Sequence, residues 1–248
     1  MKRRVVAVVG GTRGIGRVVA ELFASRGTSV AVCARSPRDR SLPKGIFHAR
    51  LDVRRRRAVK TFIGAVCKRF GSLDVLINCA GISRWRAVEE LDEAFVNDVV
   101  QTSLLGTLWS CAAAADMMPR GSCIVNVSSL AGKRGSANNS AYCAAKFAVN
   151  GITQALAKEL GPRGIRVNAV CPVYIETQTV RAALAEPASP ANGRGVKAYL
   201  GSFAKTQTAL GRLPTAKEVA EVIYFLTSEQ ASALSGQCVN VDCGAFPQ

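Results

Sequence analysis

Short apolar runs rich in β-branched residues alternate with longer stretches of helical periodicity along the whole chain. The predicted strands cover residues 5–9, 29–34, 45–51, 73–78, 123–127, 166–170 and 237–241. The predicted helices cover residues 14–25, 55–70, 92–117, 141–160 and 217–226. Strands that are apolar throughout and separated by helices predict a parallel sheet that is covered on both faces. Right-handed crossovers make such a sheet doubly wound, so the predicted fold class is α/β.

No internal repeat and no long linker interrupts this alternation, so we expect residues 1–248 to form a single domain. The exception is the stretch 174–214, which is rich in Ala, Pro, Gly and Thr and includes "AEPASPANGRG". A long irregular segment inside an ordered α/β pattern is typical of a functional loop. We therefore predict a substrate lid there.

Composition narrows the function classes. The chain has 248 residues, of which 48% are hydrophobic, enough for one sizeable core. No run approaches the ~18 apolar residues of a membrane span, and the basic start leads only into the short run Val5–Val9, so we predict a cytoplasmic protein. Nine scattered cysteines without a CxxC pair and a single histidine, His48, predict reduced thiols, no metal site and no serine–histidine hydrolase.

The formal net charge of +16 raises the question of a nucleic-acid partner. The densest basic cluster, Arg54–Arg57, is not accompanied by a helix-turn-helix, zinc-finger or aromatic RNA-binding pattern. We therefore predict no nucleic-acid and no membrane partner. A solvated arginine-rich surface or an anionic ligand explains the charge instead.

A glycine-rich turn, "VGGTRGIG", follows the first predicted strand and opens the first predicted helix. Gly10, Gly14 and Gly16 allow the tight turn and the close approach of a pyrophosphate to the positive N-terminus of that helix. The spacing is GxxxGxG rather than GxGxxG. Its place between strand and helix predicts a dinucleotide cofactor.

The end of the second predicted strand decides between the two nicotinamide cofactors. An acid at this point binds the ribose 2′-hydroxyl of NAD, but "VAVCARS" offers Arg35 and no carboxylate. Arg13 lies in the glycine turn on the same side, and two guanidinium groups suit a 2′-phosphate. We therefore predict NADP(H), with Asp52 at the adenine and the turn Asn78–Gly81 passing under the cofactor.

Tyr142 and Lys146 lie four residues apart in "SAYCAAKFAV", which places them one turn apart on one helical face. A nearby ammonium is expected to lower the pKa of the phenol, which is ordinarily about 10, toward neutrality. Such a phenol is a general acid–base. Upstream, Ser129 ends the apolar strand of "IVNVSS", where a hydroxyl can hydrogen-bond a substrate carbonyl oxygen.

The chain now resembles the short-chain dehydrogenase/reductase family, from about Val5 to Gly244. The resemblance rests on "VGGTRGIG", "NCAG", "NVSS", "YCAAK", "RVNAVCP" and "SGQCVNVDCG" in this order. Within the family the chain is most similar to the 3-oxoacyl-thioester reductases, such as the 3-oxoacyl-(acyl-carrier-protein) reductases, and to related carbonyl or polyol oxidoreductases. The resemblance implies a Rossmann fold of about seven strands and a homotetramer, or else a dimer.

It also implies roles for individual residues. Tyr142 would be the catalytic acid–base, Lys146 its partner and Ser129 the group that orients the carbonyl, with Ser103 as a fourth member of the catalytic set. The implied cofactor-binding residues, besides Tyr142 and Lys146, are Gly10, Thr12, Arg13, Gly14, Ile15, Gly16, Arg35, Asp52, Val53, Asn78, Ala80, Gly81, Pro172 and Thr177.

The sequence departs from the family pattern at several points. "QTSLLG" places Ser103 where the family usually has an asparagine that holds a relay water, and a serine cannot fully imitate the amide. "CPVYIET" places Val173 where a glycine usually lies beside the nicotinamide. These departures predict a specialised member and leave open a weak or inactive one.

The substrate side carries a further expectation. Arg84 and Arg86 are expected to line the mouth of the site, together with basic residues of the lid. The lid contributes Arg181, Arg194, Lys197, Lys205 and Arg212. These residues predict either attraction of an anionic substrate or an arginine-rich surface that continues over the lid.

The favoured function is an NADP(H)-dependent oxidoreductase that transfers hydride between nicotinamide and a ketone or secondary alcohol. The favoured direction is reduction of the ketone, as in a ketoreductase. Its expected partner is a small-molecule or carrier-bound carbonyl compound. The alternatives are a dehydrogenase of a polyol, sugar or cyclic alcohol, and an NADP(H)-binding sensor or scaffold without turnover.

Overall fold

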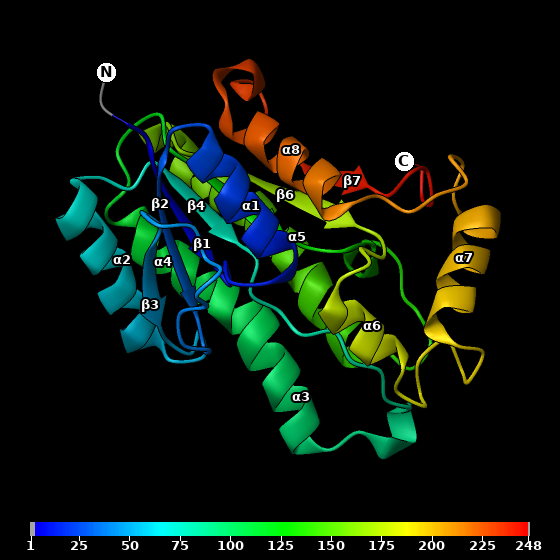
Figure 1. Ribbon diagram of the computed structural model, residues 1–248. Helices are drawn as coiled ribbons and strands as arrows, with labels where there is room; N and C mark the ends of the chain where they lie inside the picture. The colour runs from blue at the N-terminus through cyan, green and yellow to red at the C-terminus, as the bar shows by residue number, and fades with distance from the viewer. Residues whose placement is uncertain (1–2, 248) are drawn as a thin grey trace.

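A computed structural model describes residues 3–247 and contains one sheet of seven strands (Figure 1). The strand order is β3-β2-β1-β4-β5-β6-β7, and every neighbouring pair is parallel. The strands are β1 (Val5–Val9), β2 (Ser29–Ala34), β3 (Phe47–Arg50), β4 (Val75–Asn78), β5 (Cys123–Val127), β6 (Arg166–Pro172) and β7 (Cys238–Val241). The predicted α/β class and the doubly wound parallel sheet are confirmed.

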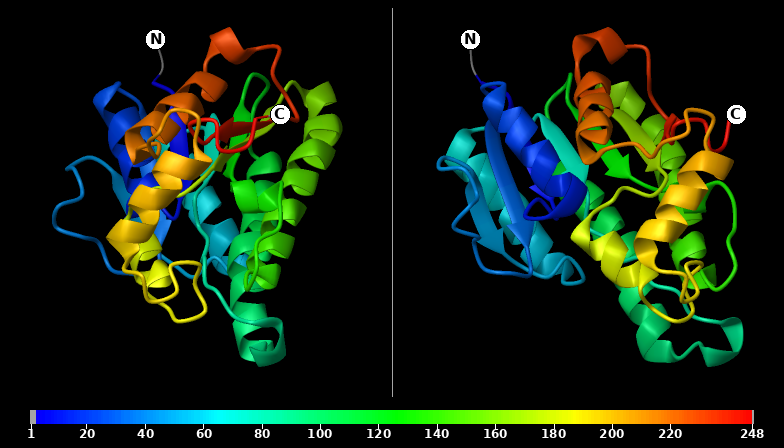
Figure 2. Two further views of the ribbon diagram at one scale, coloured as in Figure 1. Left: turned by 90° about the vertical axis from the view of Figure 1, so that its right-hand side faces the viewer. Right: turned by 45° about the vertical axis from the view of Figure 1, so that its right-hand side comes forward.

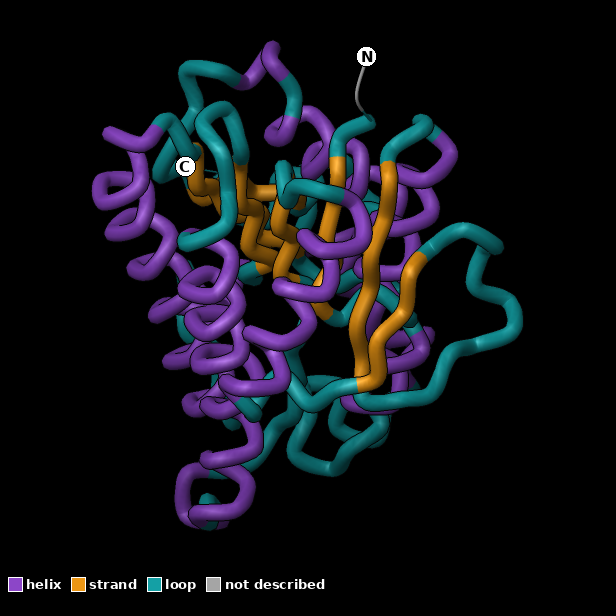
Figure 3. Tube along the Cα trace, turned by 90° about the vertical axis from the view of Figure 1, so that its left-hand side faces the viewer, coloured by secondary structure: helices purple, strands orange, loops and turns teal. Residues whose placement is uncertain are grey.

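Helices cover both faces of this sheet, as two views of the ribbon and the trace show (Figures 2 and 3). Successive side chains of β1 point to opposite faces and are all buried. Val5, Ala7 and Val9 pack in one core with helices α2, α4 and α5, whereas Val6 and Val8 pack in another with α1 and α8. The five helices are α1 (Gly14–Ser25), α2 (Arg56–Phe70), α4 (Gly106–Ala115), α5 (Ser140–Leu160) and α8 (Ala216–Thr227).

The predicted helix over 92–117 is interrupted in the structure. Helix α3 (Glu93–Val99) is followed by a π-helical stretch, η2 (Val100–Leu105), before α4 begins. A π-helical stretch widens the helix locally and is common at functional sites. Hydrophobic periodicity gave no sign of it, because the wider turn adds a residue without breaking the run of helical residues.

The segment 174–214, predicted to be irregular, contains two helices, α6 (Gln178–Leu184) and α7 (Val196–Gln207). The irregular prediction was wrong: α6 has 7 residues and α7 has 12, and both are stabilised by tertiary contacts that a local pattern does not show. Thr177 caps α6 by accepting a hydrogen bond from the Val180 amide. Leu184 and Leu200 pack with Trp85 in a small core of their own. Helix α7 lies beyond the edge of the sheet, at the right of Figure 1.

No helix in the described part of the chain combines the length and the apolar character that a membrane span needs. Within residues 3–247, no group of three or more His, Cys, Asp or Glu side chains is arranged to hold a metal ion.

Candidate active site

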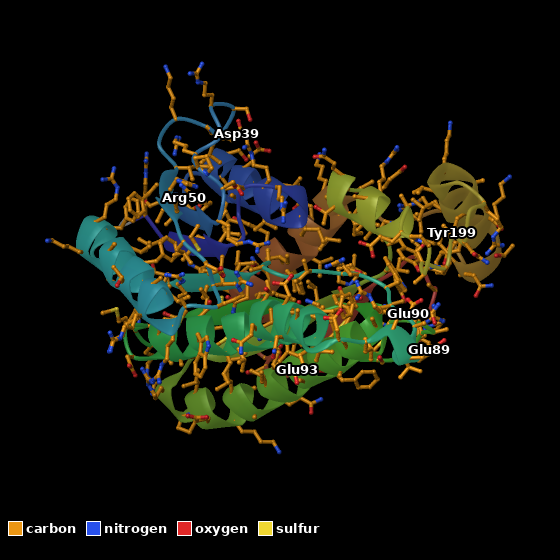
Figure 4. All side chains as sticks on the ribbon, turned by 90° about the horizontal axis from the view of Figure 1, so that it is seen from below. Asp39, Arg50, Glu89, Glu90, Glu93 and Tyr199 are labelled. Carbon is orange, nitrogen blue, oxygen red and sulfur yellow. The ribbon has the colours of Figure 1, made fainter. Side chains whose placement is uncertain are left out.

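A cavity of about 390 Å³, here called the first cavity, lies at the carboxyl edge of the sheet. Residues at or just beyond the ends of six strands line it: Gly10, Ala34, Leu51, Cys79, Val127 and Pro172. Ligands of open α/β sheets bind at this edge. Arg50, at the end of β3, and Tyr199, on α7, lie toward opposite ends of the molecule in Figure 4.

Most residues predicted from the sequence line the first cavity. They are Gly10, Thr12, Arg13, Gly14, Ile15, Gly16, Arg35, Val53, Ala80, Gly81, Ser129, Tyr142, Lys146, Pro172 and Thr177. Three predicted residues, Asp52, Asn78 and Ser103, do not line it. Sequence reasoning also missed hydroxyl groups in the wall, among them Ser36, Ser83 and Ser128.

The glycine turn leaves no room for side chains. A Cβ on Gly10, whose φ is +82°, would lie 2.7 Å from the Ala80 amide nitrogen, and one on Gly16 would lie 2.3 Å from the Gly10 carbonyl oxygen. Helix α1 begins directly after this turn, and the side chain of its N-cap residue, Arg13, makes no capping hydrogen bond. Its first amide groups are therefore available to an anion.

Arg13 and Arg35 are both exposed at the wall of the first cavity. Neither forms an ion pair with a carboxylate among residues 3–247, and no acidic side chain lines this cavity. The structure thus brings two guanidinium groups and a helix N-terminus together at one end of the cavity.

Asp52 and Asn78 have other partners. The Asp52 carboxylate accepts hydrogen bonds from Arg54, the shortest at 2.6 Å. Burial raises the pKa of Asp52, but these hydrogen bonds and the charges of Arg54 and Arg35 lower it overall. Asn78 is buried, and its Nδ2 donates to Asn126 Oδ1 at 2.9 Å, so it supports the turn from within the core.

Helix α5 carries Tyr142 and Lys146 one turn apart, and both side chains line the first cavity. Lys146 is 4% exposed; its Nζ donates to the Val127 carbonyl oxygen at 2.8 Å and lies 5.6 Å from the centre of the Tyr142 ring. Burial lowers the pKa of Lys146 to about 8.

Burial also raises the pKa of Tyr142 to about 12, against a smaller opposite effect of its hydrogen bond with Ser129. The expectation that the ammonium lowers the pKa of Tyr142 below its ordinary value is therefore wrong for this structure. The physical reason is that desolvation of the phenolate dominates, while the ammonium is directed at Val127.

Ser129 follows β5 in extended conformation and caps a short 3₁₀ helix, η3 (Leu130–Gly132), by accepting a hydrogen bond from the Ala131 amide at 3.1 Å. This cap fixes the direction of the hydroxyl, which meets the Tyr142 hydroxyl at the cavity wall. Two hydroxyl groups and one ammonium thus converge beside the end of β5, whereas Arg13 and Arg35 follow β1 and β2, on the other side of β4 in the sheet.

Ser103 lies within η2 and is fully buried. Its Oγ accepts a hydrogen bond from the Ile82 amide at 3.1 Å. A Cβ on Gly81 would lie 3.5 Å from both Ser103 Oγ and Lys146 Nζ, so Ser103 lies behind Gly81 rather than in the cavity wall.

A second cavity, of about 140 Å³, adjoins the first and shares with it Ser83, Ser129, Tyr142, Val173 and Val180. Its remaining wall includes Trp85, Arg134, Asn139, Tyr174 and Phe203. From the sequence, Trp85 and Tyr174 were expected either to supply apolar walls of the substrate side or simply to pack, and the structure places both in the wall of this cavity; Arg134 and Asn139 were missed. Both belong to the loop between Ser129 and Tyr142, and that position was the available signal.

The basic residues expected at the mouth of the site line neither cavity. Three of them form ion pairs with Glu: Arg84 with Glu186, Arg181 with Glu176 and Arg212 with Glu218. Arg86 pairs with Asp92. The prediction that Arg84 and Arg86 line the mouth was wrong, because nearby carboxylates on the surface hold their guanidinium groups.

Comparison with known proteins decides the family. Residues 9–245 match a family model described as enoyl-(acyl carrier protein) reductase. The chain belongs to the short-chain dehydrogenase/reductase family. It is therefore an oxidoreductase of a family whose members use nicotinamide cofactors, and the resemblance found in the sequence is confirmed.

Several relatives align over nearly their whole length. A short-chain dehydrogenase/reductase of Botryotinia fuckeliana is 32% identical, with 97% of this chain and 96% of the relative covered. A 3-oxoacyl-(acyl-carrier-protein) reductase of Chlamydia muridarum is 33% identical, with 96% and 95% covered. Among solved structures, ligand-free Thermoplasma acidophilum aldohexose dehydrogenase is 31% identical, with a TM-score of 0.88 and 100% of this chain and 98% of that chain covered.

Proposed function

We propose that this short-chain dehydrogenase/reductase is an NADP(H)-dependent ketoreductase. The observation that carries the proposal is the arrangement of the first cavity: unpaired Arg13 and Arg35 at one end, and Ser129, Tyr142 and Lys146 at the other. The arginines follow β1 and β2 and Ser129 follows β5, with β4 between them in the sheet, so a dinucleotide lying across these strand ends would place its 2′-phosphate at the arginines and its pyrophosphate against the start of α1. When bound, the nicotinamide supplies or accepts the hydride.

Tyr142 and Ser129 would act on the substrate oxygen. The raised pKa of Tyr142 keeps the phenol protonated near neutral pH, so it is ready to donate a proton to a carbonyl oxygen as hydride arrives at the carbon. The Ser129 hydroxyl would donate a hydrogen bond to the same oxygen. Lys146, between the Val127 carbonyl and the Tyr142 ring, would favour the phenolate that proton donation leaves behind.

The segment 174–214 would act as the substrate lid. Thr177 and Val180 line the first cavity, and Phe203 lines the second. A Cβ on Gly14 would lie 3.6 Å from Thr177 Cγ2, so the segment reaches the glycine turn. The homotetramer implied by the resemblance and the cytoplasmic location expected from the composition stay predictions.

Replacing the phenol hydroxyl tests the mechanism. We expect Tyr142→Phe to lower kcat by about 10²–10⁴-fold, because the proton donor is lost. NADPH affinity should be retained, because the phenyl ring still lines the first cavity. Tyr224→Phe, on α8 and outside both cavities, is the matched control and should keep full activity. Full activity of Tyr142→Phe would overturn the proposed mechanism.

Cofactor choice is tested separately by titrating the protein with NADPH and NADH. Arg35→Ala should weaken NADPH binding about 10–100-fold, since a hydrogen bond to a charged group contributes about 1.5–3 kcal/mol, and should leave NADH binding unchanged. Arg181→Ala, outside both cavities, is the matched control. Equal affinity of the unaltered protein for both cofactors would contradict the NADP(H) proposal.

A second candidate function is oxidation of a sugar, polyol or cyclic alcohol. Two similar structures favour it: the aldohexose dehydrogenase already described and a glucose/ribitol dehydrogenase from Brucella melitensis, which is 30% identical with a TM-score of 0.88 and 99% of this chain and 97% of that chain covered. A panel of aldoses, polyols and cyclic alcohols with NADP⁺ discriminates between the two. NADP⁺ reduction faster than NADPH oxidation by any ketone would favour this candidate. Tight NADPH binding without any turnover would favour a sensor or scaffold.

A further inference from the structure

The second cavity has an aromatic wall, one guanidinium group and one polar atom that lacks a partner. We propose that it binds the body of an aromatic ketone that carries an anionic group, with the ring against Trp85 and Phe203 and the anion at Arg134. This inference rests on the proposed ketoreductase function and specifies its substrate class.

The aromatic wall comes from three separate segments. Trp85 follows the turn after β4 and is 5% exposed, Tyr174 follows β6, and Phe203 lies on α7. The rings of Tyr174 and Phe203 meet edge to face, with their centres 5.0 Å apart at 83°. Such a wall favours a flat ring. The volume of about 140 Å³ is close to that of an apolar cavity of roughly 150 Å³ that binds benzene.

Among the described residues 3–247, Arg134 supplies the only charge in the wall of this cavity, and no acidic side chain lines it. Within residues 3–247, its guanidinium group forms no ion pair, and it lies 5.6 Å from the centre of the Phe246 ring. Arg84, Arg181 and Arg212, by contrast, each have a glutamate partner. An unpaired guanidinium at a cavity wall is suited to a carboxylate or phosphate.

Asn139 independently indicates a ligand. It is 5% exposed, and its Nδ2 donates to Ser136 Oγ at 3.2 Å, but its buried Oδ1 has no hydrogen-bond partner. Buried polar atoms are nearly always satisfied, so each exception needs an explanation. Asn139 lines the second cavity, and a small rotation of its side-chain amide would let Oδ1 accept a hydrogen bond from a hydroxyl or N–H group of a substrate there.

The two cavities meet at the catalytic hydroxyl groups, because Ser129 and Tyr142 line both. A ring in the second cavity therefore places an attached carbonyl next to these hydroxyl groups and next to the nicotinamide end of the first cavity. Val173 also lines both cavities and narrows the passage where the family usually has glycine. A short aryl ketone suits this arrangement.

The test uses three aryl keto acids in which the carbonyl and carboxylate are progressively further apart: phenylglyoxylate, benzoylacetate and 3-benzoylpropionate. Each is compared with its primary amide and with the methyl ketone acid of the same length: pyruvate, acetoacetate or levulinate. Dissociation constants are measured by calorimetry with the NADPH-loaded protein, and kcat and KM by NADPH oxidation.

For at least one length, we expect the aryl acid to bind 10-fold or more tightly than its amide and than its methyl counterpart. Arg134→Gln should abolish the preference for the acid by raising KM with little change in kcat, and Arg134→Lys should restore part of it. Phe203→Ala should abolish the preference for the aryl group. Arg181→Gln, which removes the same charge outside both cavities, should change neither preference.

Equal affinity for acids and amides, no binding of any aryl acid, or a preference that survives Arg134→Gln would overturn the inference. Failure of the proposed function looks different. In that case the aryl acids bind with the expected preference but no NADPH is oxidised. If the amides oxidise NADPH as fast as the acids do, the proposed ketoreductase function is supported and the proposed anionic substrate class is rejected.

Discussion

The carboxyl edge of the sheet and the segment 174–214 both contribute walls to one site, yet they are built differently. The sheet edge takes its residues from the ends of strands that are buried on both faces. The segment takes its residues from helices α6 and α7, whose buried side chains share one small core with Trp85. The first wall is rigid because the main cores support it, whereas the second depends on a small core of its own.

This difference indicates that the two walls have different functions. A dinucleotide and a proton donor need fixed positions, and the sheet edge provides them. A substrate must enter and leave, which favours a wall of lower local stability. The predictions below test whether the two walls differ in this way.

The largest effect is expected from two buried leucines, one in each region. Leu76→Ala, in β4 with 0% exposure, should lower the free energy of unfolding by about 3 kcal/mol or more, because the core around β4 cannot collapse into the gap. Leu184→Ala, in α6 with 1% exposure, should lower it by only about 1 kcal/mol and raise KM, because α6 can open locally. Urea denaturation and steady-state kinetics check both, and equal losses of stability would contradict the comparison.

A smaller effect is expected from the buried ammonium in the first wall. Because burial lowers the pKa of Lys146 to about 8, the unfolded state binds more protons than the folded state between about pH 8 and the ordinary lysine pKa. The stability of the unaltered protein should therefore rise by about 2 kcal/mol relative to Lys146→Met between pH 7 and pH 9.5.

Below pH 8 the lysine is charged in both states, and its burial penalty is fully present, so Lys146→Met should be at least as stable as the unaltered protein at pH 7. Subtracting the two pH profiles of urea denaturation removes the contributions of the cysteines and other groups. Parallel profiles would show that Lys146 keeps its ordinary pKa in the folded protein.

The smallest effect is expected from Ser103, where the sequence departs from its family. Ser103→Ala should lower the free energy of unfolding by about 1 kcal/mol, because the Ile82 amide loses its acceptor. Ser110→Ala is the matched control: this serine is also fully buried, but its Oγ only donates to the Gly106 carbonyl oxygen in its own helix. A loss of turnover in Ser103→Ala without a loss of stability would assign Ser103 a role in proton transfer instead.

Prediction from sequence succeeded where the signal was local. The strand Val5–Val9 and the helix Gly14–Ser25 were predicted with their observed bounds, because an apolar run and a glycine turn identify both. The common face of Tyr142 and Lys146 followed from helical spacing alone. The ion pair of Asp52 with Arg54 was not predicted, because it depends on side-chain geometry that the spacing does not contain. The expected contact of Asp52 with the adenine stays a prediction.

The sequence by itself determined the α/β class, the family and most of the first cavity, because these depend on periodicity and on residues close together in the chain. Only the tertiary structure decided which arginines are left without carboxylate partners, the direction of the Tyr142 pKa shift and the aromatic wall of the second cavity. Trp85, Tyr174 and Phe203 are far apart in sequence, and burial and charge at their meeting point depend on packing between segments. Desolvation and ion pairing depend on all the atoms that surround a group in space, and a local sequence pattern does not contain this information.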